Sequence, residues 1–160
     1  MNIYPIEAGN FKLDGGAMFG VIPKSLWQRT NPSDSDNLIE MSSRCLLVEN
    51  GNKLTLIDAG MGDKQSEKFF SFYKRSGDYD LVSSIKSAGF STDDITDVLL
   101  THLHFDHCGG ASIKNNFGKN EVLFKNAEYW SNQKHWDWAT TPNSREKASF
   151  LHENLNPIKE

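Results

Sequence analysis

The middle of the chain gathers side chains that bind metal ions, because His102, His104, Asp106 and His107 lie within six residues. Residues two apart on an extended chain project to the same side, so His102 and His104 are placed to hold one metal ion together. Asp106 and His107 follow at a turn, from which they can reach a second ion nearby. Neutral imidazoles and a carboxylate are ligands that zinc, iron and manganese accept. The run therefore predicts a site for two adjacent metal ions.

Two adjacent metal ions are suited to hydrolysis. One ion polarises the scissile carbonyl or phosphoryl oxygen, while a bridging water loses a proton near neutral pH and becomes the nucleophile. Asp106 is the candidate catalytic residue, because a carboxylate that binds the second ion is also placed to orient this water or accept its proton. The chain is therefore predicted to be a metal-dependent hydrolase.

Short apolar strands must carry these residues to one place. Residues 95–101 (ITDVLLT) are typical of a strand that runs directly into His102. Upstream, residues 43–49 and 53–58 are predicted to pair as a hairpin, because Asn-Gly within the joining residues 50–52 is a strong hairpin signal. The second of these strands stops at Asp58, where a glycine-containing turn follows.

The segments before the metal run mix loop and helix signals. Residues 28–37 are rich in turn-forming types and are predicted to separate an N-terminal β segment from the hairpin. Residues 81–88 carry apolar side chains at helical spacing, with Gly89 placed as the C-cap. This order of elements favours a mixed α/β domain built in layers.

After the metal run, the signals are shorter. Gly109 and Gly110 permit a tight turn, and we expect a helix to start there, close to the metal ions. Residues 122–124 are predicted to form a short strand. A helix is expected from about Ser144 onward, with Pro157 marking its end; its apolar face would consist of Phe150, Leu151 and Leu155.

The sequence resembles the metallo-β-lactamase superfamily at two motifs, His102-x-His104-x-Asp106-His107 and Leu56-Ile57-Asp58-Ala59-Gly60. The resemblance implies an α/β fold, an αββα four-layer sandwich with the metal ions at one edge of the two sheets. It also implies that His102 and His104 serve the first ion, and Asp106 and His107 the second, with two Zn²⁺ ions in the complete site and Fe or Mn as alternatives. Asp58 would be the carboxylate that holds one ligand in place.

The N-terminal segments 15–20 and 22–27 look like the corresponding region of the lactonase-like and organophosphate-hydrolase-like branch; a glycine-rich hairpin with aromatic core residues explains them equally well. This resemblance implies a small-molecule substrate, an ester, lactone or phosphoester. An iron-dependent oxidoreductase of the same fold is the alternative. Diiron flavoprotein relatives carry Glu where this chain has His104, which argues against them, whereas mononuclear iron dioxygenase relatives keep the histidine pattern.

The pattern departs from the family in its ligand count. A catalytic zinc generally has three protein ligands and a water, and this motif supplies two for each ion. His135 and His152 are predicted to be surface or helix-face residues rather than the missing ligands. Residues 1–160 are therefore expected to be one domain, the N-terminal portion of a longer protein, with the fold incomplete at its C-terminus. A non-catalytic fragment that self-associates, for example as a homodimer, is a further alternative.

The overall composition limits the other partners. The net charge is −4 with both signs interspersed, which gives no basic stripe for nucleic acid and no polybasic patch for a membrane. No segment has the length of a transmembrane helix, and the N-terminus does not resemble a signal peptide, so a cytoplasmic location is expected. Cys45 and Cys108 are too few for a disulfide framework, and both are expected to be small packed residues.

Overall fold

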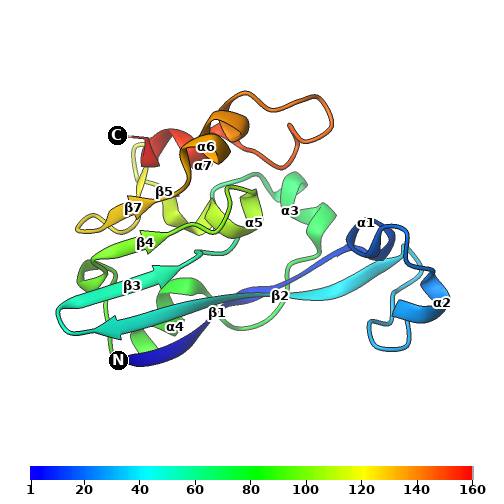
Figure 1. Cartoon of the computed structure of the whole chain (residues 1–160), viewed down its shortest axis with the longest axis horizontal. Helices are drawn as coiled ribbons and strands as arrows, with labels where there is room; N and C mark the ends of the chain where they lie inside the picture. The colour runs from blue at the N-terminus through cyan, green and yellow to red at the C-terminus, as the bar shows by residue number, and fades with distance from the viewer. Residues whose placement is uncertain (160) are drawn as a thin grey trace.

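Alternating apolar residues in two long segments produce the antiparallel ribbon that dominates the computed structural model, which describes residues 1–159 (Figure 1). Three further strands extend it to a five-stranded sheet in the order β1-β2-β3-β4-β7. The first three strands pair antiparallel, while β3, β4 and β7 pair parallel. The strands are β1 (Asn2–Asp14), β2 (Leu38–Asn50), β3 (Lys53–Ile57), β4 (Asp97–Leu99) and β7 (Glu128–Trp130), with β5 (Ser112–Lys114) and β6 (Asn120–Val122) forming a separate pair.

Short helices surround this sheet. Figure 1 shows α1 and α2 at one end of the β1–β2 ribbon, whereas α5, α6 and α7 lie beside β4 and β7, at the edge of the sheet away from β1. Among residues 1–159, no helix combines the length and the apolar character needed to cross a membrane. The helices are α1 (Gly15–Phe19), α2 (Lys24–Trp27), α3 (Glu67–Tyr73), α4 (Leu81–Ser87), α5 (Phe105–Cys108), α6 (Gln133–Thr140) and α7 (His152–Leu155), with 3₁₀ turns η1 (Thr92–Asp94), η2 (Gly109–Ala111) and η3 (Asn156–Ile158).

The main core lies on one face of the sheet. Side chains alternate between the two faces of a strand, so Leu47, Leu56 and Val98 all point to the face against which Ile85 of α4 packs. These four side chains are buried. Because the apolar period of each strand matches this face, the hydrophobic effect fixes the register that brings the ends of β3 and β4 together.

The hairpin and the first predicted helix are confirmed. Strands β2 and β3 pair as expected, and Gly51 at the turn has a φ of 60°, a left-handed conformation that glycine adopts without strain. The predicted helix over residues 81–88 corresponds to α4, with Ala88 at the C-cap and Gly89 following at a φ of 94°.

The predictions next to the metal run and after it are less accurate. The strand expected at 95–101 is confined to β4, and the one expected at 122–124 lies two residues earlier, at β6. The helix expected from Ser144 is wrong: α7 covers only His152–Leu155, and Pro157 lies inside η3. The Asn143 side chain accepts hydrogen bonds from the amides of residues 145 and 146, as an N-cap does, but the chain continues from there only as turns up to Ser149.

No α-helix starts at Gly109 and Gly110, because α5 begins earlier, at Phe105, and the two glycines lie in the 3₁₀ turn η2. Instead, they let two backbone segments approach each other. A Cβ atom on Gly109 would lie 2.0 Å from the carbonyl oxygen of Met61, and one on Gly110 would lie 2.0 Å from that of Ala59. The Gly110 amide donates to the Gly60 carbonyl at 3.0 Å, so the metal run is joined directly to the turn that follows β3.

We predict that Gly110→Ala lowers the free energy of unfolding by about 3 kcal/mol, because backbone atoms must move to admit the methyl group. Gly118→Ala is the matched control, since a Cβ there meets no atom within 4 Å and only its φ of 78° is unfavourable. That control should cost about 1 kcal/mol. Urea unfolding of both variants measures the difference, and equal losses would contradict the proposed backbone contact.

Candidate metal centre

The four predicted ligand residues come together at the edge of the sheet. The ring centroid of His102 lies 4.6 Å from that of His104 and 3.9 Å from that of His107. The Asp106 carboxylate follows on α5, with Oδ2 3.6 Å from Nε2 of His107. All four residues are partly exposed.

Asp58, at the end of β3, connects this cluster to the sheet. Its Oδ2 lies 2.8 Å from Nδ1 of His107, and its Oδ1 accepts the backbone amide of Thr101 at 2.9 Å. The Thr101 hydroxyl donates to the same carboxylate at 2.8 Å. Since the carboxylate accepts the proton on Nδ1, Nε2 of His107 is left as the nitrogen that can bind a metal ion.

The backbone of Asp58 is itself unusual. Its φ is 59°, a left-handed conformation that few residues other than glycine adopt and that Asp and Asn tolerate best. The Asp58 amide donates to the Leu99 carbonyl at 2.9 Å, which continues the pairing of β3 and β4. The strained turn therefore sends the carboxylate toward the metal run while the strand stays in the sheet.

The pKa values of the histidines in the cluster shift in two directions. Burial and the neighbouring His107 and His104 lower the pKa of His102 to about 4, and burial also lowers the pKa of His104. Both rings are therefore neutral at pH 7, the form that binds metal. Burial also acts to lower the pKa of His107, but the hydrogen bond to Asp58 and the Asp106 charge outweigh it and raise this pKa.

His135 lies on a helix, as expected, but it also contacts the site in a way that the sequence did not indicate. It is half-buried on α6, and its Nε2 accepts the backbone amide of Leu103 at 2.8 Å. Leu103 is the residue between His102 and His104, so His135 contacts the backbone of the predicted metal run. No local sequence pattern signals a contact that spans 32 residues. His152 is exposed, as expected.

Two further buried groups lie behind the cluster. Cys108 is fully buried, and burial raises the pKa of its thiol to about 12, so it is a packed residue as predicted. Lys64, which the sequence analysis missed, is only 6% exposed. Its ammonium donates to the carbonyl of Gly109 and, at 2.9 Å, to that of Ser112.

The donor set fits a divalent metal by its chemistry: three imidazoles and a carboxylate, with Asp58 behind His107. The side chains are close together but are not arranged for binding. Within residues 1–159, no group of three or more His, Cys, Asp or Glu side chains meets in a geometry that could hold an ion as it stands.

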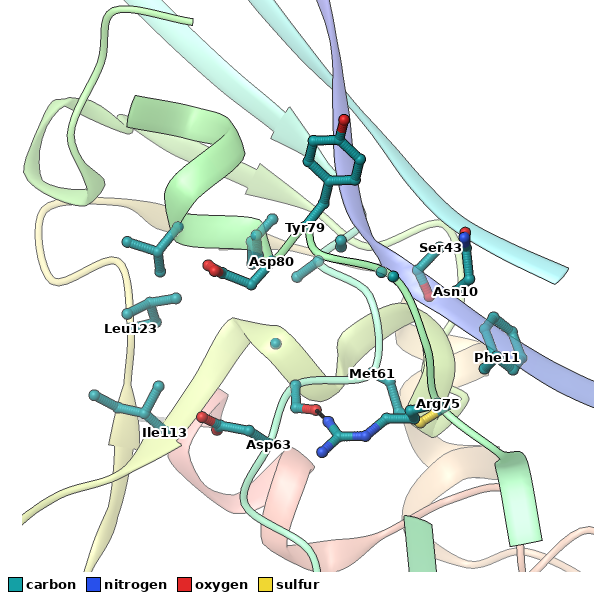
Figure 2. A pocket seen from close by; sticks show the side chains of 18 of the residues that line it. Asn10, Phe11, Ser43, Met61, Asp63, Arg75, Tyr79, Asp80, Ile113 and Leu123 are labelled. Atoms are coloured by element: carbon teal, nitrogen blue, oxygen red, sulfur yellow. Dashed lines mark hydrogen bonds between the residues drawn. The ribbon is translucent and has the colours of Figure 1, made fainter. Parts of the chain in front are cut away.

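A separate cavity of about 350 Å³ lies on the other side of Gly110, between β1, α4 and the turn after β3. Figure 2 shows the carboxylates of Asp63 and Asp80 directed into it, opposite Ile113 and Leu123. None of the four predicted ligands lines this cavity. Its walls are thus distinct from the metal cluster.

The Asp58–His107 pair predicts a pH-dependent contribution to stability in the metal-free protein. Burial opposes ionisation of Asp58, but the hydrogen bonds from His107 and Thr101 outweigh it and lower the Asp58 pKa below 3.8. The stabilisation from Asp58 is therefore lost as the pH falls through this lowered pKa. The stabilisation from His107 is full below pH 6.5 and is lost as the pH rises through its raised pKa.

Asp58→Asn should therefore destabilise the metal-free protein more at pH 5 than at pH 9. Asn retains the shape of Asp58 and tolerates its left-handed backbone. Chemical unfolding at both pH values measures the effect, with the exposed Asp36→Asn as the control. A stability deficit of the same size at both pH values would contradict the charged pair.

Comparison with known proteins identifies the family of this chain. The sequence model of the metallo-beta-lactamase superfamily matches residues 38–156. An N-acyl homoserine lactonase of Bacillus cereus is 27% identical over 103 residues, which are 58% of this chain and 40% of that protein. Another from Bacillus thuringiensis is 26% identical over 137 residues, 79% of this chain and 49% of that protein.

Solved structures show the same fold. A probable metal-dependent hydrolase from Staphylococcus aureus superposes with a TM-score of 0.88 at 32% identity, covering 96% of this chain and 54% of that one. The dizinc quorum-quenching lactonase AidC superposes with a TM-score of 0.69 at 24% identity, covering 98% and 55%. This chain spans about half the length of these relatives. The mixed α/β fold is that of the solved relatives, and the chain belongs to the metallo-beta-lactamase superfamily.

Proposed function

We propose that this chain carries part of the active site of a metal-dependent hydrolase with two zinc ions. The observation that supports the proposal best is the 2.8 Å contact between Asp58 and Nδ1 of His107, next to two neutral histidines. A carboxylate behind a histidine is the usual arrangement for fixing a metal ligand. Membership of the superfamily and the solved dizinc lactonase add support.

Each residue has a defined role in this proposal. His102 and His104 hold the first ion, and Asp106 and His107 hold the second. When bound, such a pair of ions polarises the scissile oxygen and makes a water acidic enough to attack at neutral pH. Asp58 orients His107, and a carboxylate oxygen of Asp106 orients the attacking water or accepts its proton.

The proposed substrate is a small molecule with a lactone or ester bond. The N-acyl homoserine lactonases of Bacillus support the lactone, because they match as much as 79% of this chain. Phosphoesters belong in the same panel of substrates, since the same ions polarise a phosphoryl oxygen. Zinc is the proposed metal, with iron or manganese as the alternatives.

Metal content is the first test. Protein purified without a metal-affinity column and then equilibrated with zinc should contain about two ions per chain by plasma mass spectrometry. His104→Ala and His107→Ala should each lose about one ion, because each removes a ligand of a different ion. His152→Ala, at an exposed position, is the control and should retain both. Wild-type protein without bound zinc would overturn the proposal.

Activity is the second test. Zinc-loaded protein is expected to hydrolyse lactones, with aryl esters and phosphodiesters assayed in parallel. Asp106→Asn should lower kcat by about 100-fold, because the amide cannot accept a proton from water. Asp36→Asn, which changes an exposed carboxylate in the same way, should leave kcat unchanged. A zinc-loaded protein that hydrolyses none of these substrates would contradict the assigned activity.

A further inference from the structure

We propose that His135 and Lys64, neither of them a ligand in the proposed site, position its two halves separately. His135 would position the segment of the first ion, and Lys64 that of the second. This inference rests on the proposed function for the identity of the two ions. The contacts themselves are properties of the metal-free protein.

His135 fixes the peptide that separates the two ligands of the first ion. Its Nε2 accepts the Leu103 amide at 2.8 Å, while the thiol of Cys108 donates to the Leu103 carbonyl at 3.3 Å. The Leu103 side chain is fully buried. With its amide, carbonyl and side chain all held, Leu103 leaves its two neighbours little freedom of direction. The segment of His102 and His104 is thereby ordered before any ion binds.

The His135 ring is itself held in place by its surroundings. The Asn132 side chain accepts the His135 amide at 3.4 Å at the start of α6. The ring packs edge-on against Trp138 at 5.5 Å and against Phe150 at 5.8 Å between centroids. An aromatic replacement can therefore keep this packing while losing the hydrogen-bond acceptor, which makes the acceptor separately testable.

Lys64 fixes the segment that follows the ligands of the second ion. Its ammonium donates to the carbonyls of Gly109 and Ser112, which lie at the two ends of η2. Helix α5, with Asp106 and His107, runs directly into η2. Lys64 therefore joins the end of this helix to the turn after β3, where Gly109 already lies against Met61.

The Lys64 ammonium is buried without an ion pair to any described residue. Lys64 is 6% exposed, and among residues 1–159 no carboxylate forms an ion pair with it. A buried cation without an ion pair is unfavourable unless other groups replace water as its partners. Here backbone carbonyls take that place, and removing the ammonium would leave both without their donor. Desolvation of the Lys64 ammonium is unfavourable, but its hydrogen bonds hold the end of α5 in place.

His135 and Lys64 lie on different elements of the fold, so replacing one of them should change the affinity for one ion and not for the other. His135 belongs to α6, whereas Lys64 belongs to the turn after β3. His135→Phe should weaken binding of the first ion by at least about 10-fold and leave the second nearly unchanged. Lys64→Met should do the reverse. Each variant is thus the matched control for the other.

Stepwise titration with Co²⁺ measures this, because its visible spectrum reports the ligand geometry of each ion. Titrations of His104→Ala and His107→Ala assign the two steps. The conservative variants His135→Gln and Lys64→Arg restore an acceptor and a donor, so each should recover most of the lost affinity. A variant that only lowers the stability of the protein would weaken binding of both ions together. It would not change the spectrum of one ion more than that of the other. The inference would be overturned if either variant lowered the affinity for both ions equally, or if it lowered neither affinity.

Amide exchange in the metal-free protein separates this inference from the proposed function. His135→Phe should speed exchange of the Leu103 amide about 10-fold or more and leave the Gly110 amide unchanged, while Lys64→Met should speed only the Gly110 amide. If the wild-type protein binds no metal but these exchange patterns hold, the proposed function fails and the positioning contacts stand. If both amides respond equally to both variants, the separate positioning fails whatever the metal content.

Discussion

The carboxylate of Asp58 is the contact on which the geometry of the candidate centre depends. A partly buried carboxylate needs donors to replace the water it has lost, and here a backbone amide, a hydroxyl and an imidazole provide them. These donors come from Thr101, just after β4, and from His107 on α5. Parallel pairing of β3 and β4 brings Asp58 and Thr101 to the same edge of the sheet. The sheet therefore places the Asp58 carboxylate where it can bind His107 and so orient α5.

The glycines of the metal run serve the same purpose by a different kind of contact. Side chains at Gly109 and Gly110 would occupy space taken by backbone carbonyls of the turn after β3. Their absence lets the Ala59 amide donate to the His107 carbonyl at 2.8 Å. One histidine is thus held twice, through its ring by Asp58 and through its backbone by this turn. Direct backbone contact leaves less room for adjustment than a side-chain contact, which suits a ligand that must stay in place.

The sequence was informative wherever the signal is local. The metal run, the Asn-Gly hairpin and the Asp58 turn each lie within a few residues, and their spacing alone predicts their form. The contacts of His135 with Leu103 and of Lys64 with Gly109 span 32 and 45 residues, and nothing local specifies them. The helix expected from Ser144 failed for a related reason. Apolar side chains at 150, 151 and 155 fit a helical pattern, yet Phe150 packs against His104 from an irregular segment, and Leu155 packs into the main core from the short helix α7.

That irregular segment shows how tertiary contacts prevail over periodicity. The Ser149 carbonyl accepts the Phe105 amide at 2.9 Å, and the ring of Phe150 lies 4.8 Å from that of His104. A helix through these residues would need the Ser149 carbonyl for its own hydrogen bonds. Here the carbonyl instead satisfies the first amide of α5, whose start would otherwise be unpaired. The irregular segment therefore supplies the acceptor for the start of α5 at the place where the sequence pattern predicts a helix.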